Sequence, residues 1–171
     1  MKAREKNSPS LGQDLLLLLL KIVIIAAVFA VMLIFVFGIF RCPDLSMSPA
    51  VKDGDIVIYY RLDKNYVAND AIVVDIDGEL SVRRVVAVDQ DTVDITEDGL
   101  TVNGAVQQEP GIYETTNRYE QGVDFPLTVR EGQVFVLGDS RGSSTDSRIY
   151  GPVDIQDTKG KVITIIRRRG I

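Results

Sequence analysis

The sequence predicts an all-β domain that follows a single N-terminal transmembrane helix. One observation is an apolar run over residues 15–40 whose only charged residue is Lys21, and a helix of about 20 apolar residues can cross the hydrocarbon core of a bilayer. The other is a series of short β-branched segments after residue 41, separated by turn signals, none of which keeps a helical period. Roughly 130 residues follow the run, enough for one domain with a core. Their regular strand spacing favours a sandwich or a partly closed barrel.

The charges around the apolar run predict its orientation. Basic residues precede the run at Lys2, Arg4 and Lys6. Positively charged flanks tend to stay in the cytoplasm, and Lys21 lies close enough to the start of the run to reach the headgroups. We therefore expect a cytoplasmic tail over residues 1–14, a transmembrane helix over 15–40 and an extracytoplasmic domain over 41–171.

Two other interpretations of the apolar run fit its sequence less well. A cleaved signal peptide has an apolar core of about 7–15 residues and a small-x-small exit, whereas this run is longer and ends in Phe-Gly-Ile-Phe-Arg. A lipidated Cys42 is the second, but bulky Phe40 and charged Arg41 before it are unlike a lipobox. We expect a permanent anchor in the cell membrane, with the lipid bilayer as a partner.

The composition excludes several kinds of chemistry. Cys42 is the single cysteine, so neither an internal disulfide nor a cysteine-based metal site can form. The chain has no histidine, which removes Ser-His-Asp and Cys-His catalysis and most zinc sites. A general base must then be Lys, Asp, Glu, Tyr or the N-terminal amine. The net charge of −5 argues against nucleic acid as a partner, and we expect no cofactor and no metal.

Turn signals divide the predicted domain into strands. Asp77-Gly78 is a good two-residue turn and predicts a hairpin, and residues 97–99 turn a second one. The expected strands are residues 56–60, 71–76, 80–88, 92–96, 100–104, 134–137 and 162–166. Between residues 107 and 125 the pattern lapses, and there we expect a long surface loop rather than a partner-binding element.

Two short motifs carry candidate chemistry. The first, here called the serine box, is a serine just after the apolar run, then Met-x-Pro, a short spacer, Gly-Asp and an apolar strand. Its residues are Ser46, Met47, Pro49, Gly54, Asp55 and Val57. The second, the C-terminal box, reads Gly-Asp-Ser-Arg-Gly-Ser-Ser-Thr-Asp-Ser-Arg over residues 138–148 and is followed by Gly-x-Val. Its matching residues are Gly138, Asp139, Arg141, Ser144, Asp146, Ser147, Arg148, Gly151 and Val153.

With the anchor in front of them, the two boxes resemble those of the type I signal peptidases, membrane-bound serine endopeptidases that remove signal peptides from exported proteins. The resemblance covers nearly the whole chain, with Ser140 in place of the usual Asn. It implies a signal-peptidase-type, partly closed β-barrel or sheet domain with the active site near the membrane surface. It also implies that Ser46 is the nucleophile, that its backbone N–H helps to hold the oxyanion, and that Ser144 orients the catalytic base. The implied supporting residues are Met47, Pro49, Arg84, Gly138, Asp139 and the structural ion pair of Asp146 with Arg148.

The base position departs from the family pattern. The resemblance places a lysine base where this chain has Arg83, followed by the family's own arginine at Arg84. A guanidinium has no acceptor and stays protonated, so it cannot act as an ordinary general base. Four other lysines could in principle serve as the base, but we expect each to be a surface charge. They are Lys52, Lys64, Lys159 and Lys161.

A second departure lies two residues before the nucleophile, where the family commonly has Gly or Ser and this chain has Asp44. A carboxylate there would oppose a developing oxyanion, and a lost donor at such a site costs about 2.7–4 kcal/mol. Two hypotheses remain open: Asp44 pairs with Arg83 and neutralises it, or it serves as a surrogate base for Ser46.

The resemblance therefore predicts a membrane-anchored serine endopeptidase of the signal peptidase I type, with Ser46, Arg83 and Ser144 in the catalytic positions. Its substrate would be the signal peptides of exported pre-proteins, bound as an extended strand with shallow pockets for small residues. Arg83 and Asp44 also motivate an alternative, a catalytically impaired binding module or accessory factor for secreted or pilus subunits. Retained Ser46 and the intact C-terminal box count against that alternative.

Overall fold

The computed structural model describes residues 11–167, and these form two units that meet between Val36 and Phe37. The first unit contains a helix, α1 (Leu11–Val36), with no buried residue. It is long and apolar enough to cross a membrane by length and composition, with a mean hydropathy of 3.1. The basic residues that predict its orientation lie outside the described residues.

The helix boundaries differ from the predicted range of 15–40, because α1 starts four residues earlier and ends at Val36. The last apolar residues instead form a strand, β1 (Phe37–Arg41), which pairs with β2 (Ile56–Tyr60). Gly38 explains why the strand forms here. A Cβ at Gly38 would lie 2.0 Å from Cζ of Tyr59, so only glycine lets the two backbones approach across that ring.

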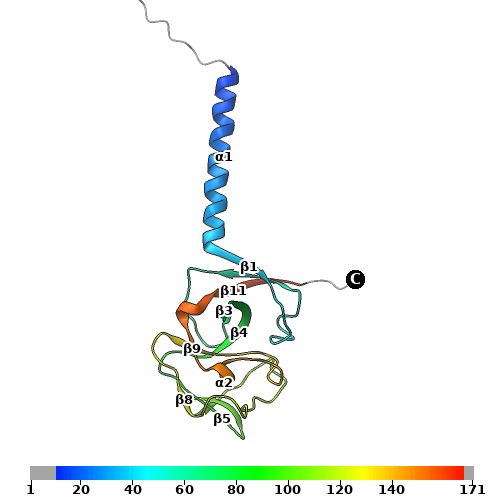
Figure 1. Ribbon diagram of the computed structural model, residues 1–171, viewed down its shortest axis with the longest axis vertical. Helices are drawn as coiled ribbons and strands as arrows, with labels where there is room; N and C mark the ends of the chain where they lie inside the picture. Colours follow the sequence, from blue (N-terminus) through cyan, green and yellow to red (C-terminus); the bar gives the residue numbers. More distant parts are fainter. Residues whose placement is uncertain (1–10, 168–171) are drawn as a thin grey trace, which may run out of the picture. The chain divides into compact units, whose positions relative to one another are not determined.

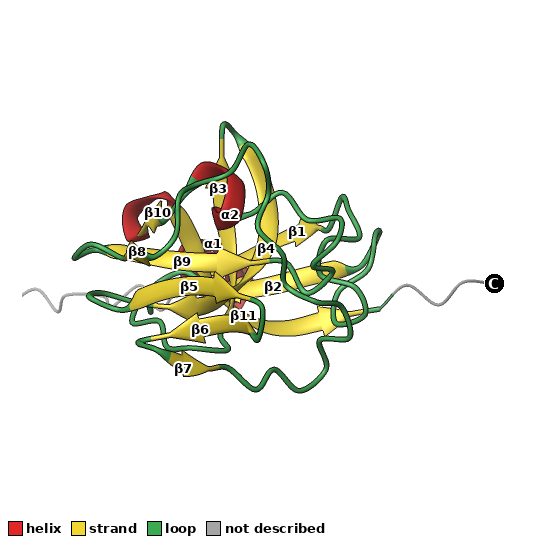
Figure 2. Cartoon of the chain, turned by 90° about the horizontal axis from the view of Figure 1, so that it is seen from below, coloured by secondary structure: helices red, strands yellow, loops and turns green. Residues whose placement is uncertain are grey.

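The second unit is all-β, as predicted, and its strands form two open antiparallel sheets (Figures 1 and 2). The larger sheet has the order β1-β2-β11-β3-β4-β9-β10, and the smaller one β7-β6-β5-β8. Neither sheet closes on itself within the described residues. The remaining elements are β3 (Ala71–Ile76), β4 (Glu79–Ala87), β5 (Thr92–Thr96), β6 (Gly99–Val102), β7 (Ala105–Val106), β8 (Leu127–Thr128), β9 (Gln133–Leu137), α2 (Ser147–Tyr150), β10 (Val153–Asp154), η1 (Ile155–Asp157) and β11 (Thr158–Ile166).

The strand β4 lies inside the larger sheet, between β3 and β9, and carries one side of the site. It joins β3 in the hairpin predicted from Asp77-Gly78, and both turn residues have positive φ, 53° and 86°, as a tight two-residue hairpin turn requires. Its buried apolar residues belong to three different core clusters, with Val82 in one, Val85 in another and Val86 in the third. Because these residues of β4 are buried in the core, a polar side chain that the strand carries among them is held in a fixed position.

Candidate active site

The serine box forms a compact turn after β1 that leads toward β2. Ser48 N–H donates to the carbonyl of Leu45 at 2.9 Å, and Val51 N–H donates to that of Met47 at 2.9 Å. Met47 is fully buried and packs with Val57 in the core. The buried side chain of Met47 explains the Met-x-Pro pattern in physical terms, because it fixes the backbone beside the serine.

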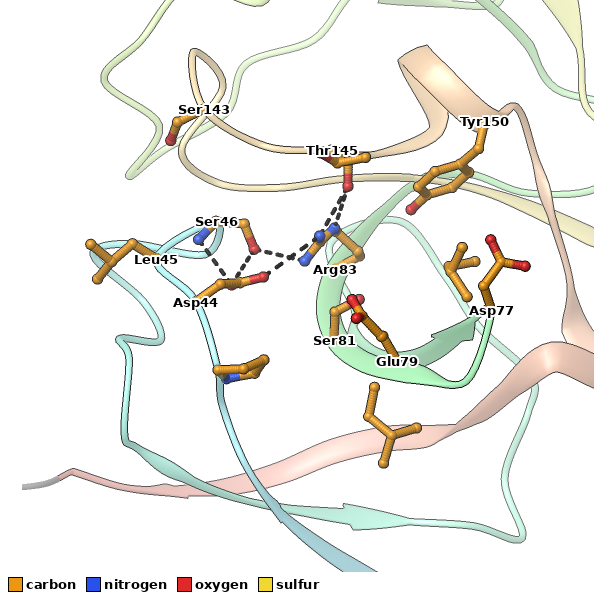
Figure 3. Close-up of a pocket in the computed structure, with 13 residues that line it drawn as sticks. Asp44, Leu45, Ser46, Asp77, Glu79, Ser81, Arg83, Ser143, Thr145 and Tyr150 are labelled. Atoms are coloured by element: carbon orange, nitrogen blue, oxygen red, sulfur yellow. Dashed lines mark hydrogen bonds and ion pairs between the residues drawn. The ribbon is translucent and has the colours of Figure 1, made fainter.

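Ser46 lies at the meeting point of three parts of the chain (Figure 3). Ser46 is buried, and its hydroxyl donates a hydrogen bond to Asp44 Oδ1 at 2.7 Å. The same hydroxyl accepts from Arg83 Nη1, also at 2.7 Å. The two boxes are joined directly, since Ser140 N–H donates to the Ser46 carbonyl at 2.9 Å. The structure thus brings Ser46, Asp44 and Arg83 together.

Arg83 uses its guanidinium donors on fixed oxygen atoms. Nη1 also donates to the carbonyl of Val82 at 2.6 Å, while Nε and Nη2 donate to the carbonyl of Thr145 at 3.1 and 2.9 Å. Nη2 lies 3.9 Å from Asp44 Oδ2. The hypothesis that Asp44 pairs with Arg83 therefore describes a real but long contact, and the guanidinium is held mainly by the two carbonyls.

The backbone N–H of Ser46, expected to hold the oxyanion, has a different partner. It donates to Asp44 Oδ1 at 3.0 Å, so one carboxylate oxygen accepts both polar hydrogens of the serine. In the structure as it stands, the expected oxyanion donor is occupied.

Ser144 lies next to Ser46 but makes none of the hydrogen bonds expected of it. Within residues 11–167 its hydroxyl is buried without a partner, so the contact that would orient a base at Arg83 is not formed. The reason is that Arg83 directs its donors at Ser46 and at backbone carbonyls. A Cβ at Gly138 would lie 2.1 Å from Ser144 Oγ and 2.6 Å from the Ser46 carbonyl. Gly138 is thus the residue that allows Ser144 and Ser46 to come so close.

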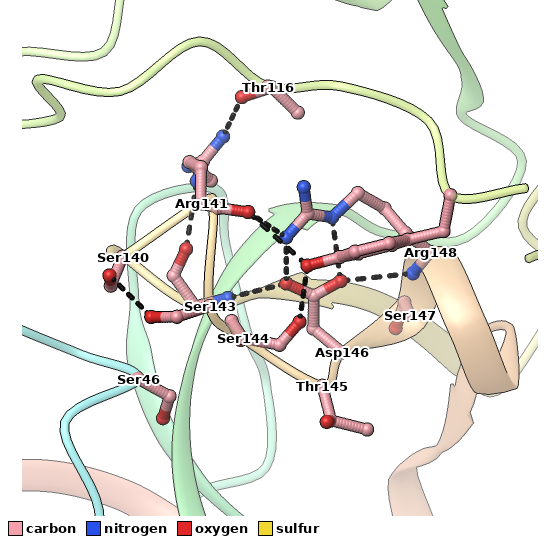
Figure 4. A network of polar contacts seen from close by, with 12 residues as sticks. Ser46, Thr116, Ser140, Arg141, Ser143, Ser144, Thr145, Asp146, Ser147 and Arg148 are labelled. Carbon is pink, nitrogen blue, oxygen red and sulfur yellow. Dashed lines mark hydrogen bonds and ion pairs between the residues drawn. The ribbon is translucent and has the colours of Figure 1, made fainter.

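The C-terminal box is held by the ion pair of Asp146 with Arg148 (Figure 4). Asp146 Oδ1 accepts from Arg148 Nε at 2.9 Å, and Oδ2 accepts from Nη2 at 2.8 Å. Both side chains are almost completely buried. Oδ2 also accepts from the Gly138 N–H at 3.1 Å, and the guanidinium lies 4.6 Å from the Tyr119 ring centroid. The pair therefore fixes the loop that carries Ser144 and Thr145.

Two further arginine pairs tie the site to its surroundings. Arg84 forms a bidentate pair with Asp139, both contacts at 2.6 Å, which joins β4 to the C-terminal box. Arg141 is fully buried and pairs with both carboxylate oxygens of Glu109, and it also donates to Thr116. Residues 107–125 are largely irregular, as predicted, but this segment also packs against the C-terminal box. Sequence reasoning did not find that role.

A groove of about 780 Å³ opens beside Ser46. It is lined by Ser46 and the three residues before it, by the β3–β4 hairpin, and by residues in and before α2. The lining residues are Pro43, Asp44, Leu45, Ser46, Ile76, Asp77, Glu79, Leu80, Ser81, Arg83, Ser143, Thr145 and Tyr150. Burial raises the pKa of the Tyr150 hydroxyl to about 12, although the positive charge of Arg83 nearby opposes the shift. Tyr150 and Thr145 are site residues that the sequence analysis missed.

No group of three or more metal-ligating side chains occurs among the residues described. The geometry offers the chemistry of a hydroxyl held between a carboxylate and a guanidinium at the wall of a groove. A serine in that setting can act as a nucleophile if a neighbour accepts its proton.

Comparison with known proteins shows which family the chain resembles. Residues 15–166 match the family described as signal peptidase, peptidase S26. The chain is 34% identical over 140 residues to signal peptidase I of Bacillus licheniformis, with 75% of each chain covered. It is 32% identical over 164 residues to signal peptidase IB of Staphylococcus aureus, which covers 82% of this chain and 85% of that protein.

Two further matches cover unequal shares of the two chains compared. Thylakoidal processing peptidase 1 of Arabidopsis thaliana is 33% identical over 124 residues, which are 72% of this chain and 32% of that protein. The chain thus spans about a third of that relative. A solved signal peptidase I from Enterococcus faecalis V583 is 29% identical, with 58% of this chain and 97% of that chain covered and a TM-score of 0.49.

Proposed function

Because the chain belongs to the signal peptidase family, peptidase S26, we propose that it is a membrane-anchored serine endopeptidase that cleaves signal peptides from exported pre-proteins. The observation that carries the proposal is the hydroxyl of Ser46, which faces a groove and is hydrogen-bonded at 2.7 Å to a carboxylate on one side and a guanidinium on the other. Names of the relatives support the same activity, and none of them supports the binding-module alternative.

The groove suits an extended peptide. Along β4, residues 79–84 pair with β3 on one side, whereas β9 pairs with β4 only from Arg84 onward. The other edge of residues 79–83 therefore borders the groove without a strand partner in the described chain. A substrate strand can add to such an edge through its main chain, which would bring a peptide carbonyl to Ser46.

The anchor and its orientation form part of the proposal. The apolar helix α1 would hold the domain at the bilayer, with residues 1–14 in the cytoplasm and residues 41–171 outside. Such a placement suits substrates whose signal peptides lie in the same membrane, because both partners then meet in two dimensions rather than three.

The activity is tested by incubating a radiolabelled pre-protein with the full chain in detergent micelles, with Ser46→Ala as the control. We expect a shortened product with the wild type and none with Ser46→Ala. Equal product from both proteins would show that Ser46 is not the nucleophile and would refute the proposed activity. Mass spectrometry of the product locates the cleaved bond.

A further inference from the structure

We propose that Asp44, rather than Arg83, accepts the proton of Ser46, so that this chain works through a serine–carboxylate dyad with Arg83 as a fixed positive charge beside it. This inference rests on the proposed peptidase function. It concerns which atom takes the proton, a role that the arginine at the base position leaves vacant.

The direction of the hydrogen bonds at Ser46 is the main argument. A guanidinium is a donor only, so the 2.7 Å contact between Arg83 Nη1 and Ser46 Oγ places an N–H on the serine oxygen. The hydroxyl must then direct its own hydrogen elsewhere, and Asp44 Oδ1 lies 2.7 Å away in position to accept it. A general base has to be within about 2.6–3.2 Å of the proton that it abstracts, and Asp44 meets that condition without any rearrangement.

No lysine competes for the role among the described residues that line the groove. Lys64 Nζ donates to the carbonyls of Ile155 and Thr158 at 3.1 and 2.8 Å. Lys159 and Lys161 form ion pairs with Asp75 and Asp70, and Lys52 lines a different pocket. Each of the four amines therefore lies away from the serine.

The other ionisable groups of the groove are placed less well. Asp77 lies in the turn between β3 and β4, Glu79 is the first residue of β4, and both side chains are exposed. Tyr150 is held neutral by its burial, so its hydroxyl is not a base near neutral pH. Cys42 is buried beside Asp44, and burial raises its pKa as well. Asp44 is thus the acceptor that the geometry selects.

The reaction balances with Asp44 as the proton carrier. Ser46 Oγ forms a bond to the scissile carbonyl carbon as its proton passes to Asp44 Oδ1. The peptide C–N bond then breaks, and the proton moves from Asp44 to the leaving nitrogen, which leaves an ester on Ser46. A water molecule attacks this ester as it gives a proton to Asp44. The ester C–O bond breaks, and the proton returns to Ser46 Oγ.

The same step can release an oxyanion donor. While Asp44 is ionised, its Oδ1 holds the backbone N–H of Ser46 at 3.0 Å, and hydrogen bonds to an ionised acceptor are the stronger ones. Once Oδ1 has taken the proton, its hold on that N–H weakens. The N–H is then free to turn to the oxyanion that forms at the same moment, with Arg83 supplying positive charge nearby.

The test compares full-length variants in micelles. Asp44→Asn keeps the shape and an acceptor for the Ser46 N–H, but it cannot take a proton. The control is Asp53→Asn, which removes the same charge from an exposed position in the turn before β2. Two rates are measured for each variant: cleavage of a pre-protein, and acylation of Ser46 by 4-nitrophenyl acetate, mapped by peptide mass spectrometry with Ser46→Ala as the blank.

We expect Asp44→Asn to lower both rates by about 100-fold or more, the usual contribution of a general base, while Asp53→Asn stays near the wild type. Equal rates for the two variants would overturn the inference. Should Asp44→Asn fold poorly in a thermal melt, Asp44→Glu and Asp44→Gln form a second pair of equal size. The glutamate variant must then be the faster one, and equal rates would again count against Asp44 as the base.

The two measurements separate the inference from the proposed function. If the wild type and Asp44→Asn both cleave pre-proteins at the same rate, the proposed peptidase function stands and the role of Asp44 as the base is refuted. A wild type that cleaves nothing but acylates Ser46 in an Asp44-dependent way refutes the function and keeps the base. Neither cleavage nor acylation in the wild type would refute both.

Discussion

Removing the carboxylate of Asp146 should be one of the most destabilising single changes in the chain. Asp146 and Arg148 are 0% and 1% exposed, and the carboxylate of Asp146 accepts four hydrogen bonds, three from Arg148 and one from Gly138. In Asp146→Ala the guanidinium stays buried without its counter-charge, which typically costs about 3–5 kcal/mol. With a urea m-value of about 2 kcal/mol/M, the unfolding midpoint should fall by about 2 M.

The assay is urea unfolding of the full chain in micelles, followed by tyrosine fluorescence because the chain has six tyrosines and no tryptophan. The matched control is Lys159→Met, which breaks the ion pair with Asp75 at 2.7 Å, where the two side chains are 36% and 26% exposed. A surface pair of that kind contributes about 0–1 kcal/mol. If Asp146→Ala shifts the midpoint no more than Lys159→Met, the ion pair does not hold the C-terminal box. The double variant Asp146→Ala/Arg148→Met should recover part of the loss, since it leaves no lone buried charge.

Three further changes test other parts of the site. Arg83→Lys should lower the rate of pre-protein cleavage, because it removes the guanidinium that donates to Ser46 Oγ and to the carbonyl of Thr145 and so directs the hydroxyl proton to Asp44; a rate above that of the wild type would contradict Asp44 as the base. Gly138→Ala should lower the unfolding free energy by about 1–3 kcal/mol and reduce cleavage, because its Cβ would meet Ser144 Oγ at 2.1 Å. An unchanged melt would show that the two boxes can separate freely. Tyr150→Phe should remove a loss of stability at alkaline pH. Burial raises the pKa of the Tyr150 hydroxyl from 10.0 to about 12 on folding. The stability that the neutral phenol contributes is therefore complete below pH 10.0 and is lost as the pH rises to about 12. Urea midpoints at about pH 8 and about pH 11 measure this, and equal alkaline losses in both proteins would contradict it.

The parts of the fold that the sequence predicted well depend on local signals. The hairpin of β3 and β4 follows from Asp77-Gly78, because few other residues accept positive φ at both positions. The end of α1 could not be predicted in the same way. The run stays apolar to Phe40, and what stops the helix at Val36 is the pairing of β1 with β2. That pairing is a tertiary contact with no local signature.

The site was predictable where a motif fixes neighbouring residues and not where the chain folds back over a long separation. Asp44 and Ser46 are two residues apart, so their hydrogen bond could be stated as a hypothesis from the sequence. The contacts of Arg141 with Glu109 and Thr116 span 32 and 25 residues. Residues 107–125 have no period that would have placed them beside the C-terminal box.

Because arginine stands where the family has a lysine, the hydrogen bond between residue 83 and Ser46 runs in the opposite direction. The arrangement of the rest of the site follows from that reversal. A neutral lysine amine has a lone pair and can accept the serine proton, whereas a guanidinium cannot. In this chain Arg83 donates to Ser46 Oγ, and it is held in that orientation by the carbonyls of Val82 and Thr145. The hydroxyl proton is thereby directed to Asp44. An aspartate that would oppose an oxyanion beside a lysine base is, beside this arginine, the group that makes the serine a usable nucleophile.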